Sequence, residues 1–249
     1  MLRLRMLALA ACGVMLGALW VHAQESDVKE VIKKAIAAEG GEKLLRKYQA
    51  GTAKIKGTME LMGAMVKISG ESTVQKPDKL KHVLTLEIMD KELQITQVYD
   101  GKKMWRSFMG QTMEVDDEES LEEMRQALRV ESAAGLVDLL DKSYTLDAIG
   151  EVKVKDKAAV GVRVNKKGQR EISLFFDKKT HLLVKTEMRV REMGQERTQE
   201  KFFSNYKDRN GLMYPSRLVI HKDGKLFMDL EITESQPLEK VDDATFAMP

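Results

Sequence analysis

Apolar and polar residues alternate with a period of two over much of the sequence, most clearly between Gly161 and Ile232. Nearly every second residue is apolar from Ile172 to Phe176, from Leu182 to Val190 and from Leu226 to Ile232. Because successive side chains on a strand point to opposite faces, this pattern predicts strands with one buried and one exposed face. One-sided strands are typical of antiparallel sheets, since parallel sheets are usually buried on both faces.

The same alternation begins at Gly51 and continues to Val115. Turn-forming pairs divide it into separate strands, namely Met62-Gly63, Pro77-Asp78, Asp100-Gly101 and Met109-Gly110. We therefore expect a mainly β protein of the α+β class, with about eleven antiparallel strands in two runs.

Helical spacing replaces the alternation at two places. The first is a pair of short helices over residues 28–36 and 42–48, separated by Gly40-Gly41. The second runs from Glu118 to Lys142, and Gly135 is expected to break it. No linker rich in proline, glycine or serine separates the two runs of strands, so residues 24–249 are interpreted as one domain.

The N-terminus resembles an export signal. Arg3 and Arg5 precede an apolar run from Met6 to Val21, and small residues stand before a cut after Ala23. This pattern is typical of a Sec signal peptide over residues 1–23. Two alternatives stay open: the segment could be an uncleaved anchor, or the lipobox-like segment ending at Cys12 could direct lipidation. The apolar core before Cys12 is short for a lipobox, so cleavage after Ala23 is preferred.

Charge and cysteine content narrow the choice of partner. The 249 residues include 41 basic and 39 acidic side chains. Without Arg3 and Arg5 the balance is 41 − 2 = 39 against 39, and no basic stripe is present, which argues against nucleic acid as a partner. The only cysteine is Cys12, so the chain after Ala23 has neither a disulfide nor a thiolate metal site.

Catalytic motifs are not evident. The histidines after Ala23 are His82, His181 and His221, and neither a His-Glu-x-x-His zinc motif nor a Gly-x-Ser-x-Gly elbow occurs. We therefore expect no catalytic residues, no metal, no cofactor and no enzymatic activity. His82 falls on an apolar strand face, where a histidine is more often a hydrogen-bonded core residue than a ligand or a switch.

Methionine is frequent, with 16 residues, of which only Met1, Met6 and Met15 precede Ala23. Several methionines lie on apolar strand faces, where their flexible side chains fill irregular space. A soft, filled core and a cavity for acyl chains both fit this composition. A wide one-sided sheet with few helices to cover it leaves apolar room, which favours a cavity somewhat.

Several turn segments share a pattern with one family of envelope proteins. These are Gly40 to Leu44, Tyr99 to Trp105, Phe175 to Leu183, Phe203 to Asp208, Asn210 to Pro215, Asp223 to Lys225 and Asp242 to Pro249. Together they resemble LolA-like, outer-membrane lipoprotein-sorting proteins. The resemblance implies a curved, unclosed antiparallel β-barrel with lid or plug helices, and an apolar cavity for acyl chains. It also implies a location in the periplasm of bacteria with two membranes.

The leading hypothesis is a periplasmic carrier or binder of lipoprotein acyl chains or other lipids, with inner- and outer-membrane proteins as candidate partners. The residues expected to line its cavity lie on apolar strand faces: Met59, Leu61, Val66, Ile68, Leu84, Leu86, Phe176, Met188, Met228 and Leu230. The alternative is an envelope sensor or interaction module with a filled core and no transported ligand. The oligomeric state does not follow from the sequence.

Overall fold

A computed structural model describes residues 27–249 with the exception of residue 193. Thirteen strands form one sheet: β1 (Ala50–Leu61), β2 (Ala64–Gln75), β3 (Lys79–Ile88), β4 (Lys91–Tyr99), β5 (Met104–Phe108), β6 (Gln111–Val115), β7 (Tyr144–Val154), β8 (Lys157–Lys166), β9 (Ile172–Asp177), β10 (Leu183–Glu192), β11 (Gln195–Arg209), β12 (Leu212–Lys222) and β13 (Lys225–Leu238). The helical elements are a helix over residues 27–38, α2 (Glu42–Lys47), α3 (Glu118–Ala134) and the 3₁₀ turns η1 (Val137–Leu140) and η2 (Asp243–Phe246). The predicted signal peptide, its cleavage after Ala23 and the fate of Cys12 lie outside the described residues.

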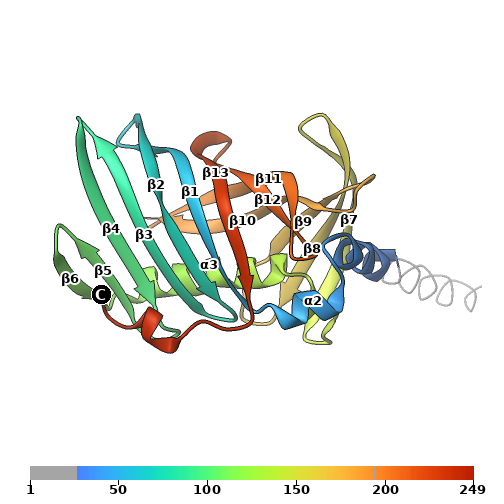
Figure 1. Cartoon of the computed structure of the whole chain (residues 1–249). Helices are drawn as coiled ribbons and strands as arrows, with labels where there is room; N and C mark the ends of the chain where they lie inside the picture. Colours follow the sequence, from blue (N-terminus) through green and yellow to red (C-terminus); the bar gives the residue numbers. More distant parts are fainter. Residues whose placement is uncertain (1–26, 193) are drawn as a thin grey trace, which may run out of the picture.

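The sheet is antiparallel, curved and open (Figure 1). Its strand order is β6-β5-β4-β3-β2-β1-β13-β12-β11-β10-β9-β8-β7, so pairing between β1 and β13 joins the two runs of strands. β6 and β7 are the two edges. The predicted mainly β, unclosed antiparallel architecture is confirmed, with thirteen strands in place of the eleven or so expected.

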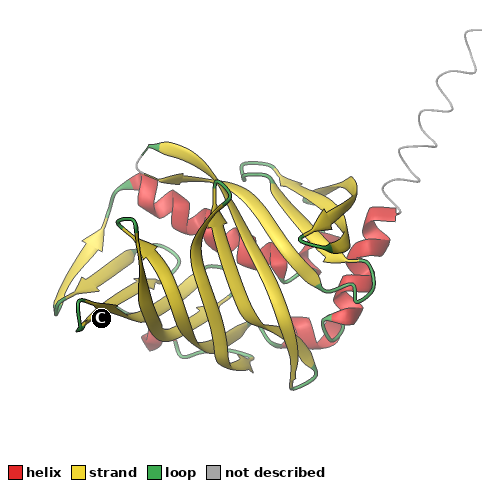
Figure 2. Cartoon of the chain, turned by 90° about the horizontal axis from the view of Figure 1, so that it is seen from above, coloured by secondary structure: helices red, strands yellow, loops and turns green. Residues whose placement is uncertain are grey.

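The helix over residues 27–38, α2, α3 and η1 cover one face of the sheet, which we call the inner face (Figure 2). Met124 and Leu128 of α3 pack against Leu80, Tyr99 and Met104 of the sheet. The helix over residues 27–38 packs with η1 against β8, β9 and β10 in a second and larger apolar cluster. The helices thereby bury apolar side chains of the inner face that would be exposed to water if the sheet stood alone.

Local sequence sets both ends of α3. The Asp117 side chain accepts a hydrogen bond of 2.8 Å from the backbone N–H of Ser120, and Glu118 and Glu119 occupy the first turn. The helix stops at Ala134, and Gly135 connects it to η1. The predicted break at Gly135 is therefore confirmed.

Two ion pairs tie α3 to the sheet. Arg170, just before β9, binds the carboxylate of Glu123 with contacts of 2.5 and 2.8 Å. Near the other end of the helix, Lys201 of β11 lies 2.5 Å from the carboxylate of Glu131. Both acids belong to α3, so the helix is held at two points along its length.

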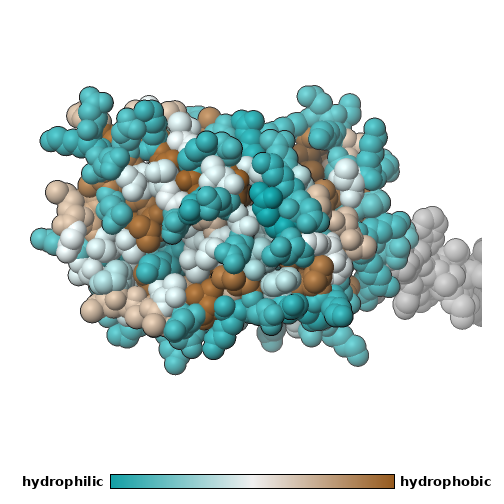
Figure 3. Space-filling view, in the orientation of Figure 1, coloured by the Kyte–Doolittle hydropathy of each residue, from teal (hydrophilic) through white to brown (hydrophobic). Residues whose placement is uncertain are grey.

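The outer face is polar over β1 and β13, whereas Val98 and Trp105 on that face are covered by Phe246 of η2. Lys54 and Lys56 of β1 form ion pairs of 2.9 and 3.1 Å with Glu234 and Glu231 of β13. In Figure 3 the visible surface is mostly hydrophilic, with small separate hydrophobic patches. No helix in the described part of the chain is both long enough and apolar enough to cross a membrane.

Methionines occupy three hairpin turns at one end of the sheet. Met62, Met89 and Met109 have φ angles of 52°, 49° and 51°, in the left-handed region that glycine and asparagine adopt more readily. Their side chains are 96%, 91% and 75% exposed. Because consecutive strands alternate in direction, the turns β1–β2, β3–β4 and β5–β6 all fall at the same end.

Glycines allow close backbone approach within the sheet. A Cβ atom added at Gly57 of β1 would overlap the carbonyl oxygen of Asp229 in β13, whereas one added at Gly63 would meet open space. We expect Gly57→Ala to lower the free energy of unfolding by more than about 2 kcal/mol, since the backbone itself has to shift.

Gly63→Ala is the matched control, because it adds the same methyl group at a turn residue with φ of +86°. It should cost only about 1 kcal/mol of left-handed strain. Urea denaturation of both variants measures the difference. Equal losses would contradict a close approach between β1 and β13 at Gly57.

Candidate functional site

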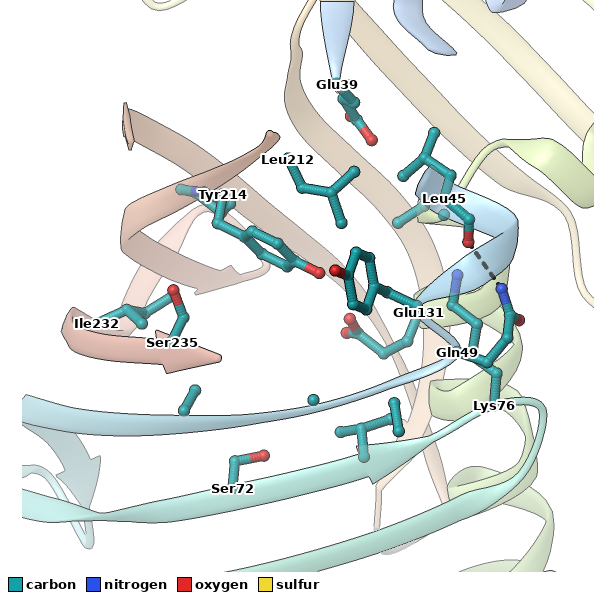
Figure 4. Close-up of a pocket in the computed structure, with 18 of the residues that line it drawn as sticks. Glu39, Leu45, Gln49, Ser72, Lys76, Glu131, Leu212, Tyr214, Ile232 and Ser235 are labelled. Carbon is teal, nitrogen blue, oxygen red and sulfur yellow. Dashed lines mark hydrogen bonds between the residues drawn. The ribbon is translucent and has the colours of Figure 1, made fainter. Parts of the chain in front are cut away.

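A cavity of about 330 Å³ lies between the inner face of the sheet and the ends of α2 and α3 (Figure 4). Its walls are mostly apolar and include Leu45, Val74, Leu128, Phe203, Leu218 and Ile232. The sheet contributes residues of β1, β2, β10, β11, β12 and β13, which are neighbours in the middle of the sheet order. The space therefore lies at the join between the two runs of strands.

Small side chains on the inner face create this space. Ala53 of β1 lies opposite Ser72 of β2 on one side and opposite Ser235 of β13 on the other. Gly51 also borders the cavity. With so little side-chain volume beneath α2 and α3, helix and sheet do not meet there, although they pack closely elsewhere.

Glu131 of α3 borders the cavity and forms an ion pair with Lys201 of β11, which lies behind the lining residues. Burial raises the pKa of the Glu131 carboxyl, but the neighbouring Lys201 ammonium outweighs it and leaves the pKa lowered overall. The Glu131 side chain is surrounded by protein and yet 47% exposed, because it borders the open cavity. It is therefore an ionised group that a ligand can meet.

Glu39, at the end of the first helix, is the most deeply buried acid of the site. Its backbone oxygen accepts a hydrogen bond of 3.1 Å from the N–H of Met213. Burial raises the pKa of its carboxyl to about 8, against the opposing effects of Lys76 and of the Leu183 backbone. Glu39 is accordingly protonated and uncharged for the most part at neutral pH.

Lys76 follows the end of β2 and borders the cavity from the side of α2. Burial lowers the pKa of its amine, while Asp138, Glu39 and Glu131 act in the opposite direction. Within residues 27–249 as described, its ammonium group forms no hydrogen bond and no ion pair within 4 Å. It is a largely buried cation without a bonded partner.

His82 lies on the inner face of β3, opposite Ser72. Burial lowers the pKa of its imidazole to about 4, so the ring is neutral at pH 7. Its Nδ1 atom is buried and, among the described residues, has no hydrogen-bond partner. The prediction that His82 is a hydrogen-bonded core residue is therefore wrong for the Nδ1 atom.

The ten residues predicted to line a cavity do not border this one. The strand registers place those on β1, β2, β3 and β13 on the inner face, farther along the strands, and Phe176 and Met188 pack in the cluster beside the first helix. Ile68, Leu86, Phe176, Met188 and Leu230 are buried, and Met59, Leu61, Val66, Leu84 and Met228 are half-buried. Their role in binding stays a prediction.

The sequence pattern did not lead to the charged residues of the site, although two of them stand at positions that the periodicity assigns to the core. Lys201 occupies an inward position of β11, opposite the apolar Ile220. Glu131 follows Met124 and Leu128 on the apolar side of α3. A charge at a position that the periodicity assigns to the core marks a polar interior. Among the described residues, no group of three or more His, Cys, Asp or Glu could hold a metal ion.

Glu39 should make stability depend on pH. Its folded-state pKa of about 8 lies above the ordinary value of 4.5, so its contribution is complete below pH 4.5 and is lost as the pH rises through 8. Between pH 6.5 and 8 we expect the free energy of unfolding to fall by about 1 to 2 kcal/mol. Glu39→Gln should remove this loss in urea titrations.

Glu30→Gln on the same helix is the control, because Glu30 is exposed and should keep the wild-type slope. This pH range lies above the range from 4 to 6.5 in which His82 acts with the opposite sign. An unchanged slope in Glu39→Gln would show that Glu39 is ionised in the folded protein.

No protein-family model matches the chain, and no curated protein matches it either. Solved structures do match. A DUF1329 family protein from Desulfovibrio piger superposes with a TM-score of 0.55 at 12% identity, over 88% of this chain and 97% of that protein. A LolA superfamily protein from Nitrosomonas europaea gives 0.55 at 11% identity over the same shares of the two chains.

A third similar structure is a domain from Vibrio parahaemolyticus that is named for outer membrane lipoprotein sorting. It superposes with a TM-score of 0.54 at 12% identity, over 89% of this chain and 97% of that chain. At this level of identity the likeness concerns the backbone and not the residues of the cavity. The chain has the fold of LolA superfamily proteins and of an outer membrane lipoprotein-sorting domain.

Proposed function

We propose that this protein binds and carries lipid or lipoprotein acyl chains in the periplasm, and that it does so without a catalytic step. The observation that carries the proposal is the apolar-walled cavity of about 330 Å³ over small residues of the inner face. Its volume is within the range of small-molecule sites, and its walls offer mainly hydrocarbon contacts. Each methylene group that moves from water into such a site contributes about 0.8 kcal/mol.

The fold supports this proposal, because the similar structures include one that is named for lipoprotein sorting. The sequence supports it as well, through the export signal expected at residues 1–23. In the proposal, half-buried inner-face residues such as Met59, Leu84 and Met228 contact the part of a long ligand that extends beyond the cavity. Methionine suits this role, since its unbranched side chain adapts to chains of different shape.

A second candidate function is an interaction module of the envelope that works without a transported ligand. The observation that favours it is the set of exposed methionines Met62, Met89 and Met109 at one end of the sheet. Exposed methionines suit surfaces that bind varied partners. The two candidates differ in whether protein secreted by a bacterium contains lipid.

Native mass spectrometry with lipid extraction makes this distinction. The chain from Gln24 onward should be exported by a two-membrane bacterium and purified without detergent. We expect phospholipid, fatty acid or acylated peptide at close to one molecule per chain. An empty protein that also takes up no fluorescent fatty acid would support the interaction module instead.

Filling the cavity should abolish uptake. Ser72 points into the cavity from β2 (Figure 4), so Ser72→Trp places an indole in the space that the ligand needs. We expect the dissociation constant for a fluorescent fatty acid to rise at least about tenfold, which corresponds to the loss of about two buried methylene contacts.

Glu71→Trp is the matched control. It introduces the same side chain one residue earlier, at an exposed position on the outer face of the same strand. Thermal unfolding of both variants checks that they remain folded. Uptake that is equally strong in Ser72→Trp and in the wild type would exclude this cavity as the binding site.

A further inference from the structure

Lys76 stands at a junction between two spaces. It borders the main cavity and also a smaller hollow of about 290 Å³, which Arg46, Val137 and Asp138 help to line. Gly135 has no side chain, and a Cβ atom there would overlap the Lys76 ammonium group. The backbone N–H of Lys76 donates a hydrogen bond of 2.8 Å to the carbonyl of Gln49, which fixes the position of this residue beside α2.

The charges around the cavity leave this ammonium group unbalanced. Glu131 is paired with Lys201 at 2.5 Å, and Glu39 is uncharged for the most part at neutral pH. Asp138 is exposed and accepts a hydrogen bond of 3.2 Å from the Ser132 hydroxyl, but it lies more than 4 Å from the Lys76 ammonium. A largely buried cation without a partner is costly, and an anion that enters the cavity removes that cost.

Tyr214 adds a neutral donor. Its side chain points into the cavity from β12 (Figure 4). Among the described residues, its hydroxyl group has no hydrogen-bond partner. Beyond these polar groups the walls become apolar, with Val74, Phe203 and Leu218. The cavity therefore combines a polar end, which holds Lys76 and the ion-paired Glu131, with a hydrocarbon-like remainder.

We infer that the preferred ligands are single-chain amphiphiles with a carboxylate head, that is, fatty acids, whose carboxylate pairs with Lys76 while the acyl chain occupies the apolar part. The inference deepens the proposed function and rests on it. A volume of about 330 Å³ suits one chain better than a lipid with two or three. A carboxylate head with one negative charge matches Lys76, the one lysine among the described residues that line the cavity.

The test compares three ligands of equal chain length: laurate, methyl laurate and dodecanol. Isothermal titration calorimetry at pH 7.5 measures their affinity for the delipidated protein. We expect wild type to bind laurate at least about tenfold more tightly than the two neutral ligands, as a hydrogen-bonded charge pair would produce. Lys76→Met should reduce this preference to less than about twofold.

Two further variants separate charge from structure. Lys76→Arg should keep the preference for laurate, because the positive charge remains. Lys47→Met removes an exposed lysine of α2 that pairs with Glu239, and it should also keep the preference. Thermal unfolding confirms that each protein is folded, and the comparison within the wild type tests the inference even if a variant fails to fold.

The outcomes for the two proposals differ. Equal affinity of the wild type for laurate and the neutral ligands overturns the inference about the head group and leaves the carrier in place. A preference that persists in Lys76→Met overturns the assignment to Lys76. If none of the three ligands binds, the proposed carrier function itself fails.

Discussion

An antiparallel sheet that remains open has to obtain cover for its apolar face from other elements. In this protein only a few helical segments cover a sheet of thirteen strands. The longest of the labelled helices is α3. The ion pairs of Glu123 with Arg170 and of Glu131 with Lys201 hold that helix against the sheet. Where large side chains meet the helices a core forms, and where Ala53, Ser72 and Ser235 face them a cavity is left.

Three titratable groups in or beside that cavity differ in charge because their neighbours differ. Burial has the largest effect on the pKa values of Glu39 and His82, so that His82 is neutral and Glu39 mostly protonated at neutral pH. Glu131 is surrounded just as closely, but the adjacent Lys201 lowers its pKa and keeps it ionised. The interior is therefore polar in one region and apolar in another, an arrangement that suits amphiphiles better than pure hydrocarbons.

Much of the fold could be predicted from the sequence, because its signals are local. The turns at Asp100-Gly101 and Met109-Gly110 and the break at Gly135 follow from residue types with definite backbone preferences. Strand β11 was harder to delimit, since its inward positions include Gln199 and Lys201 and the alternation of polarity fails there.

The site was less accessible to sequence reasoning. Alternation identifies a face along the full length of a strand, but it does not show which part of that face the helices leave free. The cavity depends on small residues, which carry little hydrophobic signal, and on their neighbours across the sheet. Glu39 and Lys76 stand at the ends of elements, outside any periodic pattern, and the fold alone brings them to one cavity.

The exposed methionines at the hairpin turns also have a chemical consequence. Oxidation turns a thioether into a polar sulfoxide, and accessible sulfur atoms react first. Met62, Met89 and Met109 lie at the surface, whereas Met104 and Met188 are shielded in the core. An oxidant would therefore change the polarity of one end of the sheet while the buried sulfur atoms, and with them the packing of the core, stay intact.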